Sequence, residues 1–230
     1  MGSTRLPGKV LLDLGGETVL ARVVRRVERA KRIDGIVVAA TTASSDDAIA
    51  HECLRLGVSC FRGSEQDVLD RYHEAAVQAA AETVVRITAD CPLIEPTLVD
   101  QTIQLFFDQR ADYASNILPR TFPRGLDTEV FTTTALERAW REAHKHHQRE
   151  HVTPYFYEHP ELFRLASLRG AEDYSRYRWT LDTADDLELI RSIYDRFNNR
   201  DDFAWQDVIA LMEREPKLEH LNARVIQKAV

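Results

Sequence analysis

The sequence is poor in cysteine, in excess positive charge and in long apolar stretches, and each shortage excludes a class of protein. Among 230 residues there are only three cysteines, Cys53, Cys60 and Cys91. Their odd number and spacing fit neither a metal site nor a redox motif, so we expect reduced thiols in or near the core. Acidic residues outnumber basic ones by 37 to 30, and the net charge of -7 argues against nucleic acid as a general partner.

The sequence also lacks the segments that direct a protein to or into a membrane. No charged segment followed by an apolar run opens it, and no apolar stretch approaches the length that spans a bilayer. Neither secretion nor a membrane is implied, and we expect a cytoplasmic protein. What is present is ordinary for a globular chain, with 44% hydrophobic and 29% charged residues. The length suits one α/β domain, 1–230, with room for an excursion.

Apolar residues alternate along the chain between the period of a helix and that of a buried strand. Helical periodicity predicts helices at 18–30, 46–56, 66–81, 96–108, 134–144, 184–197 and 205–214. Short apolar runs predict strands at 35–40, 58–61, 83–87, 127–131 and 177–181. This alternation is typical of a mostly parallel sheet with helices on both faces, a three-layer α/β/α architecture.

The pattern changes between residues 113 and 160. This segment contains a polar loop, one short strand, one helix and a stretch rich in His and Arg, and we expect it to form a subdomain inserted beside the sheet. Its histidines suggest a metal cluster: His144, His146, His147 and His151. No acid or cysteine joins them at the usual zinc spacing, however, and a polar helix surface is the simpler interpretation.

The first nine residues combine small residues with two cations, Arg5 and Lys9. Glycines let backbone N–H groups turn toward an anion, and Pro7 stiffens the turn, so the composition suits a polyphosphate. The segment is not a Walker A loop, because Val10 stands where Ser or Thr should follow the lysine. Taken alone, it is better explained as an ordinary turn before a helix.

Polar residues follow several predicted strands, at the edge where open α/β sheets bind ligands. They are Thr41, Thr42 and Ser44 after one strand, Arg62, Gly63 and Ser64 after the next, and Asp90 and Asp182 after two later strands. Magnesium prefers one or two carboxylates together with phosphate oxygens, so Asp90 and Asp182 beside a cationic loop predict a site for a metal-bound triphosphate. Two alternatives stay open. Asp90 could be a turn carboxylate, and Asp185 and Asp186 fit a helix N-terminus capped by Thr183.

Six motifs occur in order along the chain and carry a family resemblance. They read GSTRLPGK at 2–9, FRGSE at 61–65 with DVLDRY at 67–72, RITADCPLI at 86–94, GLDTEVF at 125–131, REHVTPY at 149–155 and WTLDT at 179–183. They resemble the cytidylyltransferases that activate acidic sugars, above all the spore coat polysaccharide biosynthesis protein F type, which is related to the acylneuraminate and 3-deoxy-manno-octulosonate cytidylyltransferases. The resemblance implies a Rossmann-like nucleotidyltransferase fold, similar to the glycosyltransferase A fold.

The same resemblance implies an activity and a set of site residues. The activity is transfer of CMP from CTP to a small sugar with release of pyrophosphate, in surface-polysaccharide or glycan biosynthesis, with Mg²⁺ as cofactor. Arg5 and Lys9 would hold the β- and γ-phosphates, and Asp90 and Asp182 would coordinate magnesium; these four are the expected catalytic residues. Further nucleotide contacts are expected from Gly2, Ser3, Thr4, Thr41, Arg62 and Ser64, and sugar contacts from Asp127, Glu129 and His151. The reaction needs no covalent nucleophile, only positioning and charge neutralisation.

One feature departs from the family pattern. Its members begin with a buried strand that leads into the phosphate loop, whereas this sequence opens at the loop. We therefore expect the sheet to lack its first strand, and an apolar run ending in an arginine to be encoded upstream of Met1. Without that strand, a non-catalytic sugar-nucleotide-binding or assembly protein is an alternative. A glycosyltransferase that uses a nucleotide-sugar is another, although its usual Asp-x-Asp motif is missing. A homodimer also remains open.

Overall fold

A computed structural model of the chain describes residues 5–227. The predicted contacts of Gly2, Ser3 and Thr4 therefore lie outside the described residues. The α-helices are α1 Val19–Val27, α2 Asp47–Leu56, α3 Val68–Gln78, α4 Pro96–Asp108, α5 Thr133–Glu142, α6 His146–His151, α7 Pro154–Glu158, α8 Ala184–Arg196 and α9 Trp205–Arg214. The strands are β1 Val37–Thr41, β2 Ser59–Gly63, β3 Thr83–Arg86, β4 Tyr113–Ser115, β5 Glu129–Thr132 and β6 Leu165–Ser167. Short 3₁₀ helices span Lys9–Leu11, Ser44–Asp46 and Pro216–Leu221.

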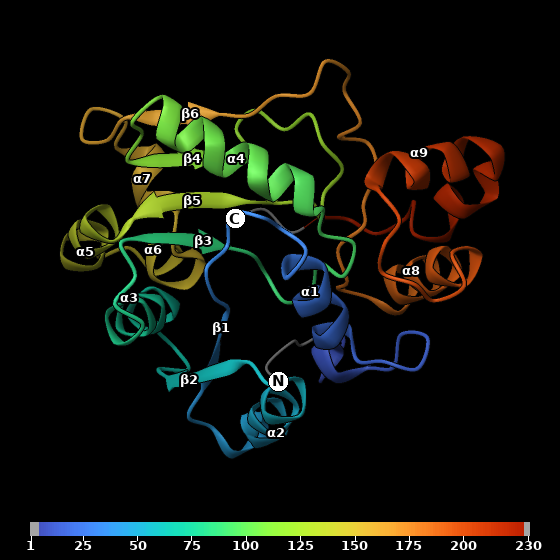
Figure 1. The fold of residues 1–230 in the computed structure, drawn as a ribbon, viewed down its shortest axis with the longest axis horizontal. Coiled ribbons are helices and arrows are strands. Elements are labelled where there is room, and N and C mark those ends of the chain that lie inside the picture. Colours follow the sequence, from blue (N-terminus) through green and yellow to red (C-terminus); the bar gives the residue numbers. More distant parts are fainter. Residues whose placement is uncertain (1–4, 228–230) are drawn as a thin grey trace.

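The described strands form two separate sheets (Figure 1). The smaller sheet pairs β1 with β2 in parallel. The larger has the order β3-β5-β4-β6, in which β6 runs parallel to β4 and β5 runs antiparallel to both of its neighbours. An antiparallel neighbour needs only a short connection, so β5 can follow β4 without a crossover helix. The periodicity of the sequence did not predict this reversal.

The two sheets are not joined to each other by strand pairing. Within residues 5–227, β1 pairs with β2 alone and β3 with β5 alone, so each has one edge without a ladder partner.

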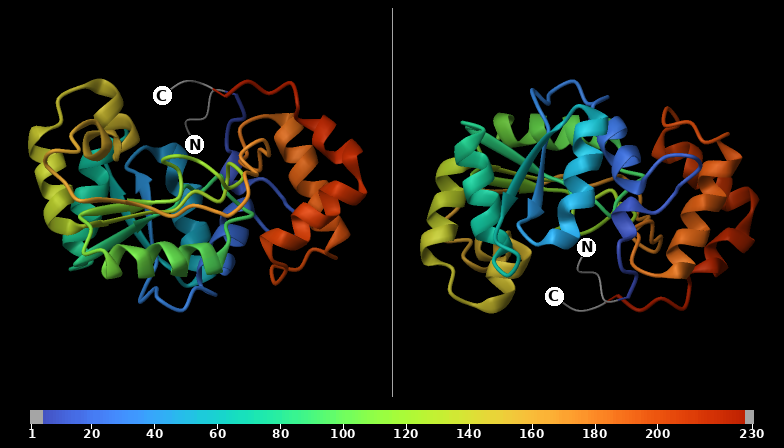
Figure 2. Two further views of the ribbon diagram at one scale, coloured as in Figure 1. Left: turned by 90° about the horizontal axis from the view of Figure 1, so that it is seen from above. Right: turned by 90° about the horizontal axis from the view of Figure 1, so that it is seen from below.

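Helices cover both faces of the larger sheet, as successive side chains of each strand point to opposite faces. Tyr113 and Phe131 pack with Leu136 of α5 and Phe156 of α7. Their sequence neighbours on the other face, such as Val130, pack with α4, which lies along the sheet (Figures 1 and 2). The expected subdomain at 113–160 thus contributes β4 and β5 to the larger sheet, whereas α5, α6 and α7 gather at one side of it.

The predicted strand at 177–181 is wrong. The segment forms a single parallel bridge, Arg124 with Arg178, and Trp179 donates from its backbone N to the Arg124 carbonyl at 2.7 Å. Only Arg178 of residues 177–181 is bridged, so the segment forms no continuous ladder. The contact is nevertheless close: at Gly125, whose φ is +106°, an added Cβ would lie 2.6 Å from the Trp179 carbonyl oxygen. The turn before β5 therefore requires glycine at this position.

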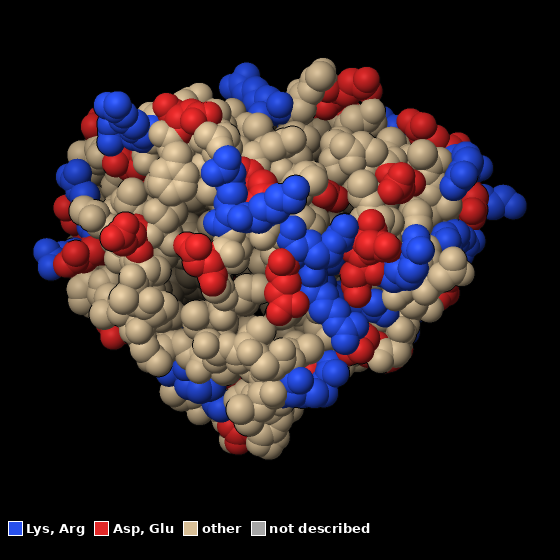
Figure 3. Space-filling model, viewed as in Figure 1, with Lys and Arg blue, Asp and Glu red and all other residues tan. Residues whose placement is uncertain are grey.

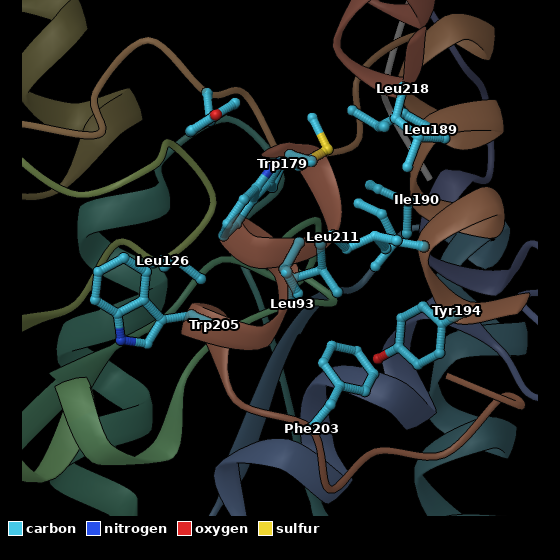
Figure 4. Close-up of a cluster of buried hydrophobic side chains, with 14 of the residues drawn as sticks. Leu93, Leu126, Trp179, Leu189, Ile190, Tyr194, Phe203, Trp205, Leu211 and Leu218 are labelled. Carbon is cyan, nitrogen blue, oxygen red and sulfur yellow. The ribbon is translucent and has the colours of Figure 1, made fainter. Parts of the chain in front are cut away.

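The largest core cluster joins α8 and α9 to the segment around Trp179 (Figure 4). Trp179, Leu126 and Ile190 are fully buried in it. Helix α8 begins after Thr183, whose side chain accepts from the Asp186 backbone N, so the predicted capping by Thr183 is confirmed. The prediction for the thiols is also confirmed: Cys53 and Cys91 are buried, Cys60 is half-buried, and none of the three forms a disulfide. No helix in residues 5–227 is long and apolar enough to cross a bilayer.

Candidate nucleotide site

Backbone hydrogen bonds bring the two predicted metal carboxylates side by side. Asp90 lies in the turn after β3, and its carbonyl accepts from the Leu181 backbone N at 2.8 Å and from the Thr180 hydroxyl at 3.3 Å. Asp182 is the next residue along that segment. Each carboxylate is partly buried, with side-chain exposures of 23% for Asp90 and 16% for Asp182. The structure therefore unites two residues that lie far apart in the sequence.

The Lys9 ammonium lies between these two carboxylates. Its Nζ is 2.6 Å from Asp90 Oδ2 and 2.9 Å from Asp182 Oδ1. Burial disfavours a charged lysine, but Asp90 and Asp182 outweigh it and raise the pKa of Lys9 above its ordinary value. Burial likewise opposes a charged Asp182, yet Lys9, Arg178 and Arg5 lower the pKa of Asp182 to about 2. Lys9 and Asp182 are therefore both charged at neutral pH.

Two arginines complete the charge network at Asp182. Arg5 Nη2 lies 2.9 Å from Asp182 Oδ2, and Arg178 Nη2 lies 2.7 Å from the same oxygen. Arg178 is itself held by Asp186, whose Oδ1 is 2.9 Å from Arg178 Nε. Asp186 is fully buried and also accepts from the side chain of Asn222. Asp186 thus has the structural role expected of a helix-start acid and also fixes a residue of the site.

Sequence reasoning missed Arg178, although a signal for it existed. Tyr177, Trp179 and Leu181 are apolar and buried, whereas Arg178 and Asp182 are partly exposed. In extended backbone, Arg178 and Asp182 lie on the same face, opposite that apolar set. A cation four residues before a proposed metal ligand, on the same face of an extended segment, is a reason to include Arg178 in the site.

The residues expected near the nucleoside lie at the carboxyl ends of β1 and β2. Thr41 ends β1 and pairs in register with Gly63 at the end of β2. The Thr41 hydroxyl and backbone N donate to Asp46 Oδ2 at 2.7 and 2.9 Å. Arg62 donates to the carbonyl oxygens of Thr41 and Ala43, bridging the two strand ends. These residues therefore gather at the predicted edge, engaged in contacts with one another.

Ser64 lies just beyond the end of β2 and stabilises the turn into α3. Its hydroxyl accepts from the Asp67 backbone N at 3.1 Å, and its carbonyl accepts from Arg71. The sequence predicted its position next to Arg62 at the sheet edge. The observed hydrogen bonds give it a turn-forming role in addition to any ligand contact.

A cavity of about 300 Å³ connects the cationic loop with the end of β1. Its lining includes Gly8 and Lys9 from the loop, Thr41 from β1, Arg71 from α3 and Ala89 next to Asp90. The volume is at the small end of the range for ligand pockets. Figure 3 shows that this face of the molecule is hollowed near its middle, with acidic and basic side chains gathered beside the hollow. The cavity thus lies within reach of both the carboxylates and the sheet edge.

The three residues predicted to contact a sugar lie in different environments. Asp127 is partly exposed and pairs with Arg120 through both carboxylate oxygens. Glu129 is only 2% exposed; it pairs with Arg86 and accepts from the Tyr113 hydroxyl at 2.7 Å. Its carboxylate is therefore already used by partners inside the protein. A buried pair of this kind keeps its neighbours in one arrangement, so Glu129 positions β3 against β5.

His151 ends the short helix α6 and keeps about a third of its side chain exposed. Burial and the charge of Arg86 lower the pKa of His151 below its ordinary value, while Glu150 opposes the shift. The other histidines of this segment go elsewhere: His147 contacts Glu158 at 2.5 Å, and His146 contacts Glu150. Within residues 5–227, no three His, Cys, Asp or Glu side chains gather as a metal cluster.

The donor set at Asp90 and Asp182 fits a magnesium ion that also binds phosphate. Magnesium takes one or two carboxylates from the protein and completes its shell with water and phosphate oxygens. Two carboxylate oxygens here converge on one cation, the Lys9 ammonium, and a metal ion held by both carboxylates would lie near the same point. Arg5 and Lys9 provide the positive charge that a triphosphate requires.

Several known proteins are similar to this chain. A family model described as cytidylyltransferase matches residues 1–222. An uncharacterised protein of Methanocaldococcus jannaschii, MJ1063, is 39% identical and aligns over 99% of this chain and 93% of its own length. The spore coat polysaccharide biosynthesis protein SpsF of Bacillus subtilis is 36% identical over 94% of this chain and 92% of its own.

Solved structures extend the likeness to the fold. A cytidylyltransferase from Leptospira borgpetersenii superposes with a TM-score of 0.92 at 34% identity, covering all of this chain and 95% of that one. A CMP:2-keto-3-deoxy-manno-octonic acid synthetase complexed with CTP gives a TM-score of 0.64 at 18% identity, over 85% and 95% of the two chains. The second match supports the fold alone. On the sequence match across nearly its whole length, together with a Rossmann-like nucleotidyltransferase fold, this chain belongs to the cytidylyltransferase family.

Proposed function

We propose that this protein transfers CMP from CTP to a sugar and releases pyrophosphate, in the biosynthesis of a surface polysaccharide or another glycan. The observation that carries the proposal is the convergence of Asp90 and Asp182 on Lys9, beside Arg5 and a cavity that reaches the end of β1. Family membership supports the nucleotidyl transfer. A sugar acceptor is supported by the names of two kinds of relative. One is SpsF, and the other is the 3-deoxy-manno-octulosonate cytidylyltransferases, of which one is 36% identical over 44% of this chain.

In this reaction a sugar hydroxyl attacks the α-phosphorus in line, and the bond to the β-phosphate oxygen breaks. Arg5 and Lys9 would bind the β- and γ-phosphates and neutralise the charge that develops on pyrophosphate. Asp90 and Asp182 would hold Mg²⁺, which when bound neutralises the negative charge of the phosphate oxygens that would otherwise repel the nucleophile. Thr41 and its hydrogen-bonded neighbours would lie beside the nucleoside, and Asp127 beside the sugar. No covalent intermediate is required.

A second candidate rests on the separation of the two sheets. Within residues 5–227, β1 and β3 each have an edge without a ladder partner, so no strand pairing joins the sheet that contains Thr41 to the sheet beside Asp90. A protein of this form that binds CTP without turning it over would be a binding or assembly component of the same pathway.

Pyrophosphate release distinguishes the two candidates. The purified chain is incubated with CTP and a panel of acidic and amino sugars, with and without Mg²⁺, and a coupled assay follows pyrophosphate. Cytidylyl transfer predicts release with CTP, at least one sugar and metal together. Nucleotide binding seen by calorimetry, with no release from any sugar, would instead favour the binding component.

Calorimetry also tests the assignment of the loop. Arg5→Ala should weaken CTP binding much more than CMP binding, because the proposed contacts are to the distal phosphates that CMP lacks. Equal losses for both nucleotides would place the Arg5 side chain away from those phosphates.

A further inference from the structure

Lys9 is the residue at which the proposed metal and phosphate sites conflict. Its Nζ is 2.6 Å from Asp90 Oδ2 and 2.9 Å from Asp182 Oδ1, the oxygens best placed to hold a metal ion. Only 14% of its side chain is exposed, so water competes weakly for the ammonium. The same ammonium cannot remain between the carboxylates and also contact a phosphate. One of the two contacts has to give way when ligands bind.

The charges explain why the present arrangement is stable without ligands. Asp90, Asp182 and Asp186 bring three negative charges to the network, and Arg5, Lys9 and Arg178 bring three positive ones. A divalent cation that entered this neutral network would have to approach three cations at close range. A triphosphate that entered would have to attract Arg5 and Lys9 away from their carboxylates. Each ligand alone therefore meets an unfavourable electrostatic balance.

Lys9 can move more easily than Arg178, which also binds Asp182. Arg178 is held at Nε by Asp186 at 2.9 Å, and Asp186 is fully buried. Lys9 follows Gly8, whose φ is +68°, in a short 3₁₀ helix, and its ammonium ends a flexible four-carbon chain. Its Nζ donates hydrogen bonds to Asp90 Oδ2 and Asp182 Oδ1. Departure of Lys9 thus exposes one oxygen of each carboxylate, while Arg178 keeps Asp182 in place.

We propose that Lys9 is an exchangeable counter-ion, which excludes divalent metal from Asp90 and Asp182 until a nucleotide draws its ammonium onto the phosphates. The inference rests on the proposed function, since it takes a nucleoside triphosphate as the ligand. Metal and nucleotide then bind with positive coupling: each removes the competitor of the other. The metal-free protein is expected to bind a divalent cation weakly, although both carboxylates are already in position.

Metal binding without nucleotide or sugar tests this directly. Mn²⁺ serves as the probe, because its unbound form can be counted by electron paramagnetic resonance. Lys9→Met removes the charge and keeps a chain of similar length, so it should bind Mn²⁺ at least about tenfold more tightly than the wild type. Mg²⁺ should displace the Mn²⁺. Lys9→Arg, which keeps a cation, should remain as weak as the wild type.

Lys217→Met is the matched control, since Lys217 is exposed on the 3₁₀ helix Pro216–Leu221. It should leave Mn²⁺ affinity unchanged. Thermal unfolding gives a second readout: Lys9→Met should melt lower than the wild type without metal, because two carboxylates lose their shared cation, and millimolar Mn²⁺ should recover much of the loss. If Lys9→Met does not fold, Lys9→Gln, which keeps a hydrogen-bond donor, takes its place. Mn²⁺ affinity no higher than wild type in the uncharged variant overturns the proposal.

The outcome is separable from that of the proposed function. Wild-type pyrophosphate release together with equal Mn²⁺ affinities in wild type and Lys9→Met would remove the counter-ion exchange and leave cytidylyl transfer standing. Tighter Mn²⁺ binding by Lys9→Met in a protein that never releases pyrophosphate would do the reverse.

Discussion

The carboxylate side of the candidate site, with Asp90 and Asp182, adjoins a larger buried core than the β1–β2 side, with Thr41 and Arg62. Asp90 and Asp182 lie beside the larger sheet and the core cluster of α8 and α9, where Trp179, Leu126 and Ile190 are fully buried. Thr41 and Arg62 lie on the two-stranded sheet, whose cluster has, among the described residues, five buried members: Leu20, Val24, Ala40, Ile49 and Cys53. Val37, in β1, is 40% exposed.

The difference in core size indicates that the carboxylate side is rigid and that the β1–β2 side is adjustable. Chemistry at a phosphate needs charges held in place before the ligand arrives, and the carboxylates are tied to the largest core. Recognition of a base can tolerate movement, since it needs only contacts that form on binding. A small sheet with an unpaired edge opens locally at low cost. We therefore expect perturbations to act most strongly on the carboxylate side.

The largest contrast should appear in stability when the same side chain is shortened on each side. Leu126→Ala should destabilise the protein by about 4–5 kcal/mol, because the dense core around it cannot collapse into the space. Leu20→Ala should cost less, about 3 kcal/mol, since Leu20 already lines the cavity and its neighbours have room to relax. Urea unfolding measures both. Equal losses would show that the two sides are packed equally well.

The next largest effect is expected on the rate of turnover. Asp182→Asn keeps the size of the side chain and removes its charge, so the rate should fall at least about a hundredfold, or about 3 kcal/mol, with the fold retained. Asp185→Asn, an exposed position on the first turn of α8, is the control and should keep the wild-type rate. Circular dichroism checks the fold of both. A fully active Asp182→Asn enzyme would contradict the assignment of this residue.

The sequence predicted the helical framework better than the strands. The helices Pro96–Asp108 and Trp205–Arg214 begin and end where the periodicity placed them, because a helix carries its pattern and its terminal signals within one segment. Strands depend on partners elsewhere. The extended segment at 177–181 was predicted as a strand, but it forms one bridge.

The same limit applies to the site. The proximity of Asp90 and Asp182 was predicted from strand ends that meet at one sheet edge. The two residues do lie together, but Asp182 follows an extended segment with a single bridge and not a strand. The location of Lys9 between them could not, because it depends on how the loop folds back over 81 residues to Asp90 and 173 to Asp182. Glu129 shows the same limit. The family resemblance implied a sugar contact there, and the sequence could not show that its carboxylate is buried and paired with Arg86.

Acid should weaken the carboxylate side by a smaller amount. The pKa of Asp182 is lowered from 3.8 to about 2 in the folded protein, so its ionised form stabilises the fold. That contribution, about 2 kcal/mol at 1.36 kcal/mol per pKa unit, is complete above pH 4 or so and is lost as the pH falls through about 2. The difference in unfolding free energy between wild type and Asp182→Asn should therefore shrink across this window. A difference that stays constant with pH would mean that Asp182 is not held by Lys9 and the two arginines in solution.

The smallest effect is expected on the adjustable side. Arg62 bridges the ends of β1 and β2 through the carbonyl oxygens of Thr41 and Ala43, and its ion pair is with Asp47, whose side chain is 58% exposed. Exposed pairs contribute little, so Arg62→Ala should change stability and CTP affinity by about 1 kcal/mol each, or about fivefold in the dissociation constant. Calorimetry with CTP and urea unfolding give the two values. Arg25→Ala, at another partly exposed ion pair on α1, controls for the loss of a surface charge.

A loss of CTP affinity beyond about a hundredfold in Arg62→Ala would place the Arg62 guanidinium directly on the nucleotide, since about 3 kcal/mol is the scale of a charge-assisted contact rather than of a surface pair. The β1–β2 side would then be as preorganised as the carboxylate side, despite its smaller core.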